Sequence, residues 1–381
     1  MARAHLDHNA TTPVDERVAR RQYELTLALP GNPSSLHAEG REARRVLEEA
    51  RRSVAARLAA DTHEVVFTAS ATEANNTAVF GLAAARPGKR RIVAGSIEHP
   101  SVVAPLRRLE AQGHRITWLP VDSSGRLDLE AALAALDEDV AFVTAMSVNN
   151  ETGVRQPAAL LAEACRTRGI PFHCDRVQEP GKAELRAGAE RADLETYSAH
   201  KFNGPKGVGI LVRRAETRWS PLILGGGQER ESRAGTENVP AIAAAALALE
   251  LALDEAPRRI EHRRSAERRL RRGLEARAVP HVLNSGDADR VPGTLSLRFP
   301  GLYGETLLMN LDLRGVSVSL GSACSSGAIE ASPVLRAMGL DPEANFSSLR
   351  VSIGHETTDE EVDLFVDAMA EIARAEGKFA P

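Results

Sequence analysis

Residues 140–174 contain two apolar runs, Val140-Ala141-Phe142-Val143-Thr144-Ala145-Met146 and Pro171-Phe172-His173-Cys174. Between them, the stretch from Ala158 to Arg168 has helical spacing of its apolar residues. Short apolar runs of this kind are typical of buried strands, and strands that alternate with helices are typical of a parallel sheet. This stretch therefore predicts an α/β fold.

The same alternation extends along the chain on both sides of this unit. It predicts a mainly parallel sheet covered by helices on both faces. The strands are expected at 65–68, 91–94, 115–119, 194–197 and 208–212, and the helices at 39–59, 101–112 and 129–136.

A second, smaller α/β domain is expected after a long helix from Val239 to about Glu255. Pro257 interrupts that helix, because proline lacks the backbone N–H that a helix interior needs. Strands expected at 294–299, 316–319 and 349–353 then alternate with helices at 305–311, 332–338 and 359–376. We predict a large domain of residues 15–257, with residues 1–14 and 258–381 forming the small one.

Composition limits the class of function. The chain has 381 residues, 43% of them hydrophobic, and a net charge of -4, which favours a globular protein and argues against nucleic-acid or membrane-surface binding. The basic run from Arg263 to Arg277 is expected to be a solvated helix face. Three cysteines without paired spacing indicate neither a disulfide framework nor a zinc site, so a cytoplasmic protein without a membrane span is expected.

Lys201 and Asp175 are candidate site residues because of their positions at the ends of expected strands. Lys201 lies in the turn Ser198-Ala199-His200-Lys201-Phe202-Asn203-Gly204, between two expected strands. Asp175 ends the expected strand that begins at Pro171, and it should lie about one strand away from Lys201 in the sheet. Loss of hydration would lower the pKa of such a lysine and make its amine a nucleophile. An amine that forms a Schiff base and a carboxylate for the ring nitrogen are the two fixed points of a pyridoxal phosphate site.

Other polar motifs follow the strands at their carboxyl ends, where ligands bind in sheets of this kind. The segment Thr68 to Asn76 joins a strand to a helix, where free N–H groups attract a phosphate or where a small residue simply caps the helix. Glu98-His99-Pro100 and Asn149-Asn150-Glu151-Thr152-Gly153 follow two further strands. We expect all these segments to face one pocket.

The small domain contributes a thiol and a guanidinium. Leu320-Gly321-Ser322-Ala323-Cys324-Ser325-Ser326-Gly327 is rich in small residues and predicts a movable loop with an uncovered sulfur, whereas Cys165 and Cys174 are expected in the core. Arg350 lies in an expected strand, either turned inward to bind a substrate carboxylate or outward at the surface.

Taken together, these residues resemble the cysteine desulfurases of the class-V aminotransferase family, the NifS/IscS-like group of pyridoxal phosphate enzymes of fold type I. The resemblance covers nearly the whole chain and implies a seven-stranded, mainly parallel sheet in the large domain. The motifs that carry it are residues 6–13, Thr72-Glu73, Glu98-His99-Pro100, residues 149–153, His200-Lys201, residues 226–230 and Gly321-Ser322-Ala323-Cys324.

The resemblance implies roles around the cofactor ring. Lys201 would hold the cofactor covalently and later move the α-proton of the substrate. His99 would stack on the ring and act in acid–base steps, and Val177 would pack on the other face. Asp175 would pair with the pyridinium nitrogen, and Gln178 would bond the ring hydroxyl.

It also implies which residues hold the phosphate and the substrate. The phosphate would be bound by Ala71, Thr72, Ser198 and His200, joined by Thr236 reaching from a second subunit of a homodimer. Asn150 would contact the cofactor and, with Arg350, hold the substrate carboxylate. Cys324, as a thiolate, would take sulfur from L-cysteine, leave alanine, and pass the sulfur to an acceptor protein. No resident metal is expected, although Cys324 could ligate a transient iron–sulfur cluster on a scaffold partner.

Four positions depart from the family pattern: Ser147, Arg176, the pair Glu179-Pro180, and Ala199. Arg176 stands where a small residue is usual, and on a buried strand it needs a carboxylate or a path to solvent, or else it competes for Asp175. Two alternatives to a desulfurase therefore stay open. One is a related enzyme such as a selenocysteine lyase, and the other is a weakened paralogue that serves as a sulfur-transfer binding partner.

Overall fold

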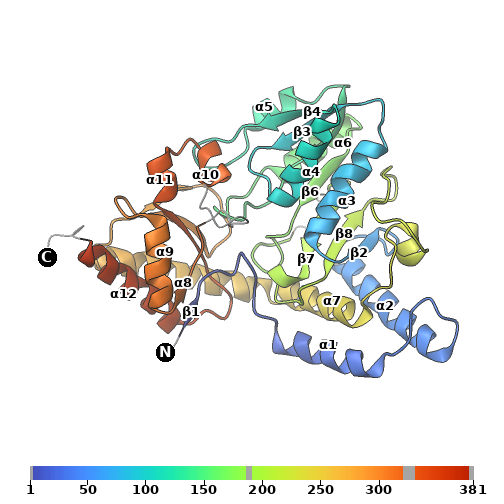
Figure 1. Ribbon diagram of the computed structural model, residues 1–381, viewed down its shortest axis with the longest axis horizontal. Coiled ribbons are helices and arrows are strands. Elements are labelled where there is room, and N and C mark those ends of the chain that lie inside the picture. The colour runs from blue at the N-terminus through green and yellow to red at the C-terminus, as the bar shows by residue number, and fades with distance from the viewer. Residues whose placement is uncertain (1–2, 186–190, 321–330, 377–381) are drawn as a thin grey trace.

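The computed structural model describes residues 3–185, 191–320 and 331–376, and its centre is a seven-stranded sheet (Figure 1). The strand order is β2-β8-β7-β6-β5-β3-β4. Only β8 runs antiparallel to its neighbours, so the predicted mainly parallel sheet is confirmed. The strands are β2 Val65–Thr68, β3 Arg91–Gly95, β4 Arg115–Leu119, β5 Val140–Thr144, β6 Phe172–Asp175, β7 Leu194–Ser198 and β8 Gly209–Arg213.

Helices cover both faces of this sheet, because its strands are apolar on both sides. Helices α3 (Ala71–Ala84) and α4 (Pro100–Ala111) pack on one face, against Phe142 and Leu211 among others. The other face is covered by α1 (Glu16–Ala28), α2 (Ala38–Arg57), α5 (Leu129–Ala134), α6 (Ala158–Thr167) and α7 (Val239–Asp254). Cys165 and Cys174 are buried thiols in this second layer, as predicted.

The rest of the chain builds a separate hydrophobic cluster around smaller sheets (Figure 1). Ala4 and Leu6 belong to this cluster, which supports the assignment of the first residues to a small domain. The exact division at residue 257 stays a prediction. The elements are β1 Ala4–His5 with β11 Val316–Ser317, β9 Val282–Leu283, β10 Thr294–Arg298 and β12 Ser348–Ser352, and α8 Ala256–Ala276, α9 Gly304–Leu313, α10 Pro333–Ala337, α11 Pro342–Phe346 and α12 Asp359–Ala375.

The basic run in α8 forms a largely solvated face, as its composition suggests. Its exposed arginines are Arg264, Arg268, Arg269, Arg271, Arg272 and Arg277, while Leu270 and Leu274 pack in the smaller domain's hydrophobic cluster. Two charged residues depart from this: Arg263 is only 3% exposed, and Glu267 is buried and pairs with Arg290. Charge spacing along a helix does not reveal such buried partners.

Arg176 finds carboxylates of its own in the interior. It is 3% exposed, its Nη1 donates to Glu179 Oε2 at 2.9 Å, and its Nε lies 3.2 Å from Glu195 Oε1. Glu195 also accepts a hydrogen bond from Tyr197. Asp175 has different partners, Asn75 and the backbone N–H of Val177. The Arg176 and Glu179 departures therefore form one buried ionic cluster beside β7.

Replacing Arg176 by methionine is expected to lower the free energy of unfolding by about 3–5 kcal/mol, because the buried carboxylate of Glu179 loses its counter-charge and Glu195 keeps only its longer pair with Arg214. Urea unfolding followed by circular dichroism measures this. The matched control is Arg155→Met, since Arg155 forms a more open pair with Asp289 and should cost less than about 1 kcal/mol. A loss below 1 kcal/mol for Arg176→Met would contradict the expectation.

Candidate active site

A cavity of about 950 Å³ lies at the carboxyl ends of the central strands. The segments that follow β3, β5, β6 and β7, together with the start of α3, line this cavity. Arg350 and residues between Ala331 and Ala337, from the part of the chain that forms the smaller sheets, line it as well. This volume is at the upper end of the range for ligand sites, so the cavity has room for a cofactor and a small substrate together.

Lys201 reaches this cavity from a single 3-10 turn, Ala199–Lys201, that directly follows β7. Its Nζ donates to the carbonyl oxygens of Asn9 at 2.5 Å and Ala10 at 2.7 Å. Burial lowers the pKa of the amine to about 8, and the nearby guanidinium of Arg350 adds to the shift. About half of this lysine is therefore a neutral amine at pH 8, a far larger share than for an ordinary lysine.

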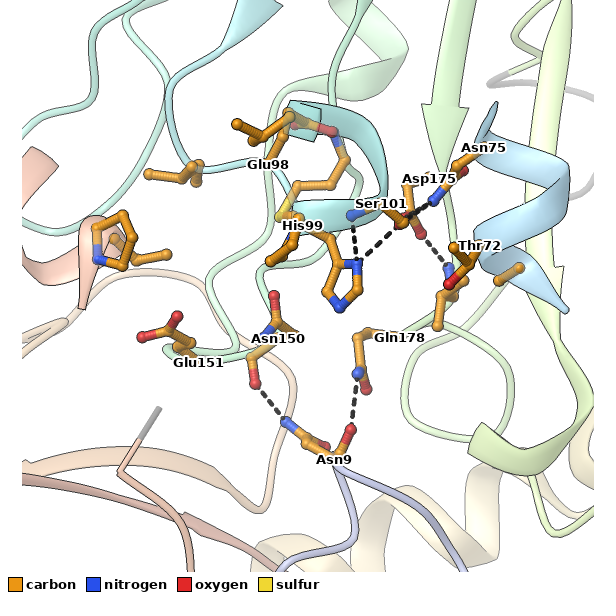
Figure 2. Close-up of a pocket in the computed structure, with 18 of the residues that line it drawn as sticks. Asn9, Thr72, Asn75, Glu98, His99, Ser101, Asn150, Glu151, Asp175 and Gln178 are labelled. Carbon is orange, nitrogen blue, oxygen red and sulfur yellow. Dashed lines mark hydrogen bonds between the residues drawn. The ribbon is translucent and has the colours of Figure 1, made fainter. Parts of the chain in front are cut away.

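Asp175 ends β6, and its carboxylate is held in place from two sides (Figure 2). Oδ2 accepts from Asn75 Nδ2 at 2.8 Å, and Oδ1 accepts from the backbone N–H of Val177 at 3.0 Å. The same Asn75 nitrogen donates to Ser101 Oγ, whereas its Oδ1 is buried without a hydrogen-bond partner in the described part of the chain.

His99 caps the start of α4 and presents the far side of its ring to the cavity (Figure 2). Nδ1 accepts from the backbone N–H of Ser101 and lies 2.8 Å from the Ser101 hydroxyl, which leaves Nε2 facing the open space. Burial lowers the pKa of the imidazole, which favours the neutral ring. Its neighbour Glu98 is fully buried, and burial raises the pKa of that carboxyl to about 8.

The first turn of α3 and the end of β7 form a second polar group. Ser70 caps the 14-residue helix, and Ala71 and Thr72 line the cavity at its positive end. Ser198 and His200 line the same region. His200 Nδ1 lies 3.1 Å from Thr11 Oγ1, and burial lowers the pKa of its imidazole to about 4. Helix-start N–H groups with hydroxyls suit an anion such as a phosphate, and the one carboxylate of this turn, Glu73, is turned to Arg233 and the Ala69 backbone N–H and does not line the cavity.

Arg350 faces inward from β12 and is 6% exposed. One of its nitrogens donates to Asp7 Oδ1 at 2.7 Å and another to the carbonyl oxygen of Asn150 at 3.4 Å. Asp7 thereby orients a guanidinium that belongs to the lining of the cavity.

The structure brings most of the predicted site residues together. Thr236 is exposed and lies outside the cavity of its own chain, and Cys324 lies outside the described residues. Ala331, just after the undescribed segment, does line the cavity. The predicted residues that line it are Ala71, Thr72, His99, Asn150, Asp175, Val177, Gln178, Ser198, His200, Lys201 and Arg350.

Sequence reasoning did not assign three residues that shape this site. Asn75 fixes Asp175, Asp7 orients Arg350, and Lys182 donates a hydrogen bond to the Gln178 side chain. Asn75 and Asp7 stand inside motifs noted above, so their spacing was a usable signal. Lys182 follows Gln178 by four residues through a turn, and such spacing alone carries no signal.

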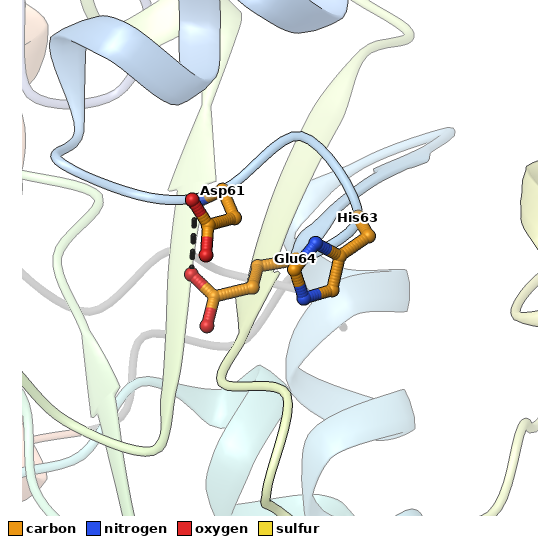
Figure 3. A group of neighbouring side chains, drawn as sticks. All are labelled: Asp61, His63 and Glu64. Carbon is orange, nitrogen blue, oxygen red and sulfur yellow. Dashed lines mark hydrogen bonds between the residues drawn. The ribbon is translucent and has the colours of Figure 1, made fainter.

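A cluster of potential metal ligands lies elsewhere, at Asp61, His63 and Glu64 (Figure 3). Glu64 already accepts from the backbone N–H groups of Asp61 and Ala215 and pairs with Arg214. Its carboxylate is thus engaged in holding the loop before β2, which accounts for the cluster without an ion.

The donor set of the cavity fits pyridoxal phosphate. A fixed carboxylate, a lysine of lowered pKa and an anion-binding helix start line one cavity, and these match the ring nitrogen, the aldehyde carbon and the phosphate. The unpaired Asn75 Oδ1 is a further polar atom at the base of the site.

No helix in the described part of the chain has the length and apolar character to cross a membrane.

Known proteins share this architecture over almost the whole chain. Residues 4–365 match the family aminotransferase class-V. A cysteine desulfurase from Nostoc sp. is 40% identical over 372 residues, which cover 98% of this chain and 93% of the relative. The structure of a NifS-like protein superposes with a TM-score of 0.92 at 36% identity, covering 98% of this chain and 100% of that one.

A structure of SspA in complex with cysteine has a TM-score of 0.82 at 29% identity and covers 93% of this chain and 100% of that one. These likenesses cover nearly the whole chain. The chain belongs to the aminotransferase class-V family and, within it, to the pyridoxal phosphate-dependent cysteine desulfurases.

Proposed function

We propose that this desulfurase takes the sulfur of L-cysteine onto Cys324 as a persulfide, releases L-alanine and passes the sulfur to an acceptor protein. The observation that carries the proposal is the amine of Lys201, whose pKa is lowered to about 8, in one cavity with Asp175 and Arg350. The likeness to a protein whose structure holds cysteine supports the choice of substrate.

The proposed cofactor residues each offer a matching group. Asp175 would hold the pyridinium nitrogen, Gln178 the ring hydroxyl, and His99 and Val177 the two faces of the ring. Ala71, Thr72, Ser198 and His200 would hold the phosphate. When bound, pyridoxal phosphate supplies an electron sink for the pair left at the α-carbon of an amino acid.

Proton movement falls to Lys201 and His99. A lysine with a pKa near 8 accepts a proton from the substrate α-carbon and returns it without a large energetic penalty at either step. Because Nδ1 accepts from the Ser101 backbone N–H, the neutral imidazole of His99 carries its hydrogen on Nε2 and can donate it into the cavity. Once that proton has been donated, Nε2 can take one back.

Arg350 and Asn150 would hold the substrate carboxylate. A guanidinium binds a carboxylate through two parallel N–H groups, which fixes the amino acid in one orientation. Asp7 keeps the guanidinium plane in place, so the α-carbon is presented toward Lys201.

The sulfur step uses the thiolate of Cys324. It attacks the substrate sulfur, a sulfur–sulfur bond forms, and the carbon–sulfur bond breaks with its electron pair moving to the carbon. A proton then completes alanine. When the thiolate of an acceptor attacks the outer sulfur, a new sulfur–sulfur bond forms on the acceptor, the bond to Cys324 breaks, and Cys324 is released as a thiolate.

We also propose a homodimer in a reducing compartment such as the cytoplasm, serving an acceptor or an iron–sulfur scaffold. Leu222 and Leu224 are 41% and 79% exposed, close in sequence to the exposed Thr236, which supports a covered interface there. Free Cys165 and Cys174 thiols are consistent with reducing conditions.

The pKa of Lys201 gives a pH prediction for the protein freed of pyridoxal phosphate. A lowered pKa means that the reactive neutral amine appears at lower pH, so acylation of Lys201 should rise with a midpoint near pH 8. Exposed Lys206 is the internal control for labelling of an unburied amine. Peptide mass spectrometry after brief labelling measures both, and a Lys201 midpoint that stays near the ordinary lysine value of about 10.4 would contradict the expectation.

The Cys324→Ala protein tests the proposed function. Wild type should bind pyridoxal phosphate and form alanine from L-cysteine, whereas Cys324→Ala should change its visible spectrum on cysteine addition and form alanine at least about 100-fold more slowly, because the nucleophile that takes the sulfur is missing. Cys165→Ala removes a core thiol instead and should keep turnover.

Three results would overturn the proposal. Alanine formation from cysteine by Cys324→Ala at the wild-type rate would show that no persulfide forms at this residue. Activity of both proteins on selenocysteine alone would indicate a selenocysteine lyase, and a colourless wild-type protein that does not bind the cofactor would indicate a binding partner.

A further inference from the structure

Lys182 is a fully buried amine below the cavity, 1% exposed, in the turn that follows Gln178. Its Nζ donates to Asn9 Oδ1 at 2.8 Å and to Gln178 Oε1. Both acceptors are side-chain amides of residues that line the cavity. Neither the proposed proton transfers nor the proposed sulfur step uses this lysine.

The two contacts decide which way each amide points. A side-chain amide has an oxygen end and an NH₂ end of nearly the same shape, and its neighbours choose between the two orientations. An amine that donates to both oxygens turns both oxygens toward itself. The NH₂ ends of Gln178 and Asn9 must then face away from Lys182.

For Gln178, this orientation presents N–H groups on the cavity side. Nε2 donates one hydrogen to the carbonyl oxygen of Asn9 at 3.2 Å (Figure 2). The second hydrogen remains for a ligand oxygen in the cavity that Gln178 lines. A flipped Gln178 would present an acceptor there instead.

For Asn9, the orientation connects the N-terminal segment with the substrate side. Its Nδ2 donates to the carbonyl oxygen of Asn150 at 3.1 Å and to Thr294 Oγ1 at 3.0 Å (Figure 2). Its backbone oxygen accepts from Lys201. The buried amine of Lys182 is thus linked through hydrogen bonds to Gln178 directly, and to Asn150 and Lys201 through Asn9.

The protonation state of Lys182 does not alter this polarity. Burial lowers the pKa of the amine well below its ordinary value, and Arg263, Lys201 and Arg350 act in the same direction. A neutral amine still carries two N–H groups, which suffice for its two acceptors, and the ammonium form carries three.

We propose that Lys182 is a positioning residue that locks the Gln178 amide with its N–H toward the cofactor's ring hydroxyl and holds Asn9 against Asn150. The inference rests on the proposed contact of Gln178 with the cofactor. Lys182 itself touches neither cofactor nor substrate.

The test compares pyridoxal phosphate binding by cofactor-free wild type, Lys182→Met, Gln178→Ala and the double variant. Titration gives the dissociation constant and the absorption maximum of the bound cofactor, so the result does not depend on turnover. Lys182→Met should weaken binding by about tenfold and shift the maximum, because the Gln178 hydrogen bond is lost. In the Gln178→Ala background the same change should cost less than about twofold, because the two residues act as one unit.

Lys206→Met is the matched control, since it removes an exposed amine with the same chemical change and should bind as wild type does. If Lys182→Met does not unfold cooperatively on heating, Lys182→Gln replaces it, because an amide fills the space without dictating polarity and should weaken binding by about threefold.

Each other outcome overturns the inference in a recognisable way. Equal losses in both backgrounds would give Lys182 a purely structural role, and unchanged binding and spectrum would give it none at the site. No effect of Gln178→Ala on binding or spectrum would remove the proposed cofactor contact of Gln178 itself, which is a failure of the proposed function.

Discussion

The site depends on the hydrogen bonds from the Lys201 amine to the backbone oxygens of Asn9 and Ala10, because they join the turn after β7 to the N-terminal segment. The N-terminal segment is itself pinned on both sides. Its Leu6 packs in the smaller hydrophobic cluster, the Asn9 backbone N–H donates to Ser352 Oγ, and the Thr12 backbone N–H donates to the His200 carbonyl oxygen. A change in how the smaller sheets pack would therefore reach the lysine through residues 6–12, without touching the central sheet.

Burial works on the acids and bases of the cavity in opposite directions and brings them toward the same pH range. It lowers the pKa of Lys201 to about 8 and raises that of the Glu98 carboxyl to about 8, because each loses hydration of its charged form. Burial also lowers the pKa values of His99 and Lys182. Asp175 and Arg350 face the same cavity with hydrogen-bond partners that suit their charged forms. The cavity thus separates groups that exchange protons from groups that hold charge.

The fold and the line of the cavity could be predicted because both follow from periodicity. Strand ends in a parallel sheet meet at one edge, so residues after β3, β5, β6 and β7 had to converge. The partners of buried charges could not be predicted in this way. Arg176 finds Glu195 only because β6 and β7 are neighbours, and Arg263 is covered because α8 packs against the chain at Gly293. Such contacts join residues far apart in sequence, and Lys182 reaches Asn9 across more than 170 positions.

The reversed direction of β8 has a consequence for how this scaffold could be altered. Because β8 is antiparallel to β7, with Ser198 opposite Gly209, the segment that carries Lys201 is closed by a hairpin rather than by a long crossover. The other cavity segments lead into helices, whose connections can absorb added residues. Between β7 and β8 an added residue would shift either the strand register or the amine. Length variation in engineered or natural variants should therefore collect in the crossovers and spare residues 199–208.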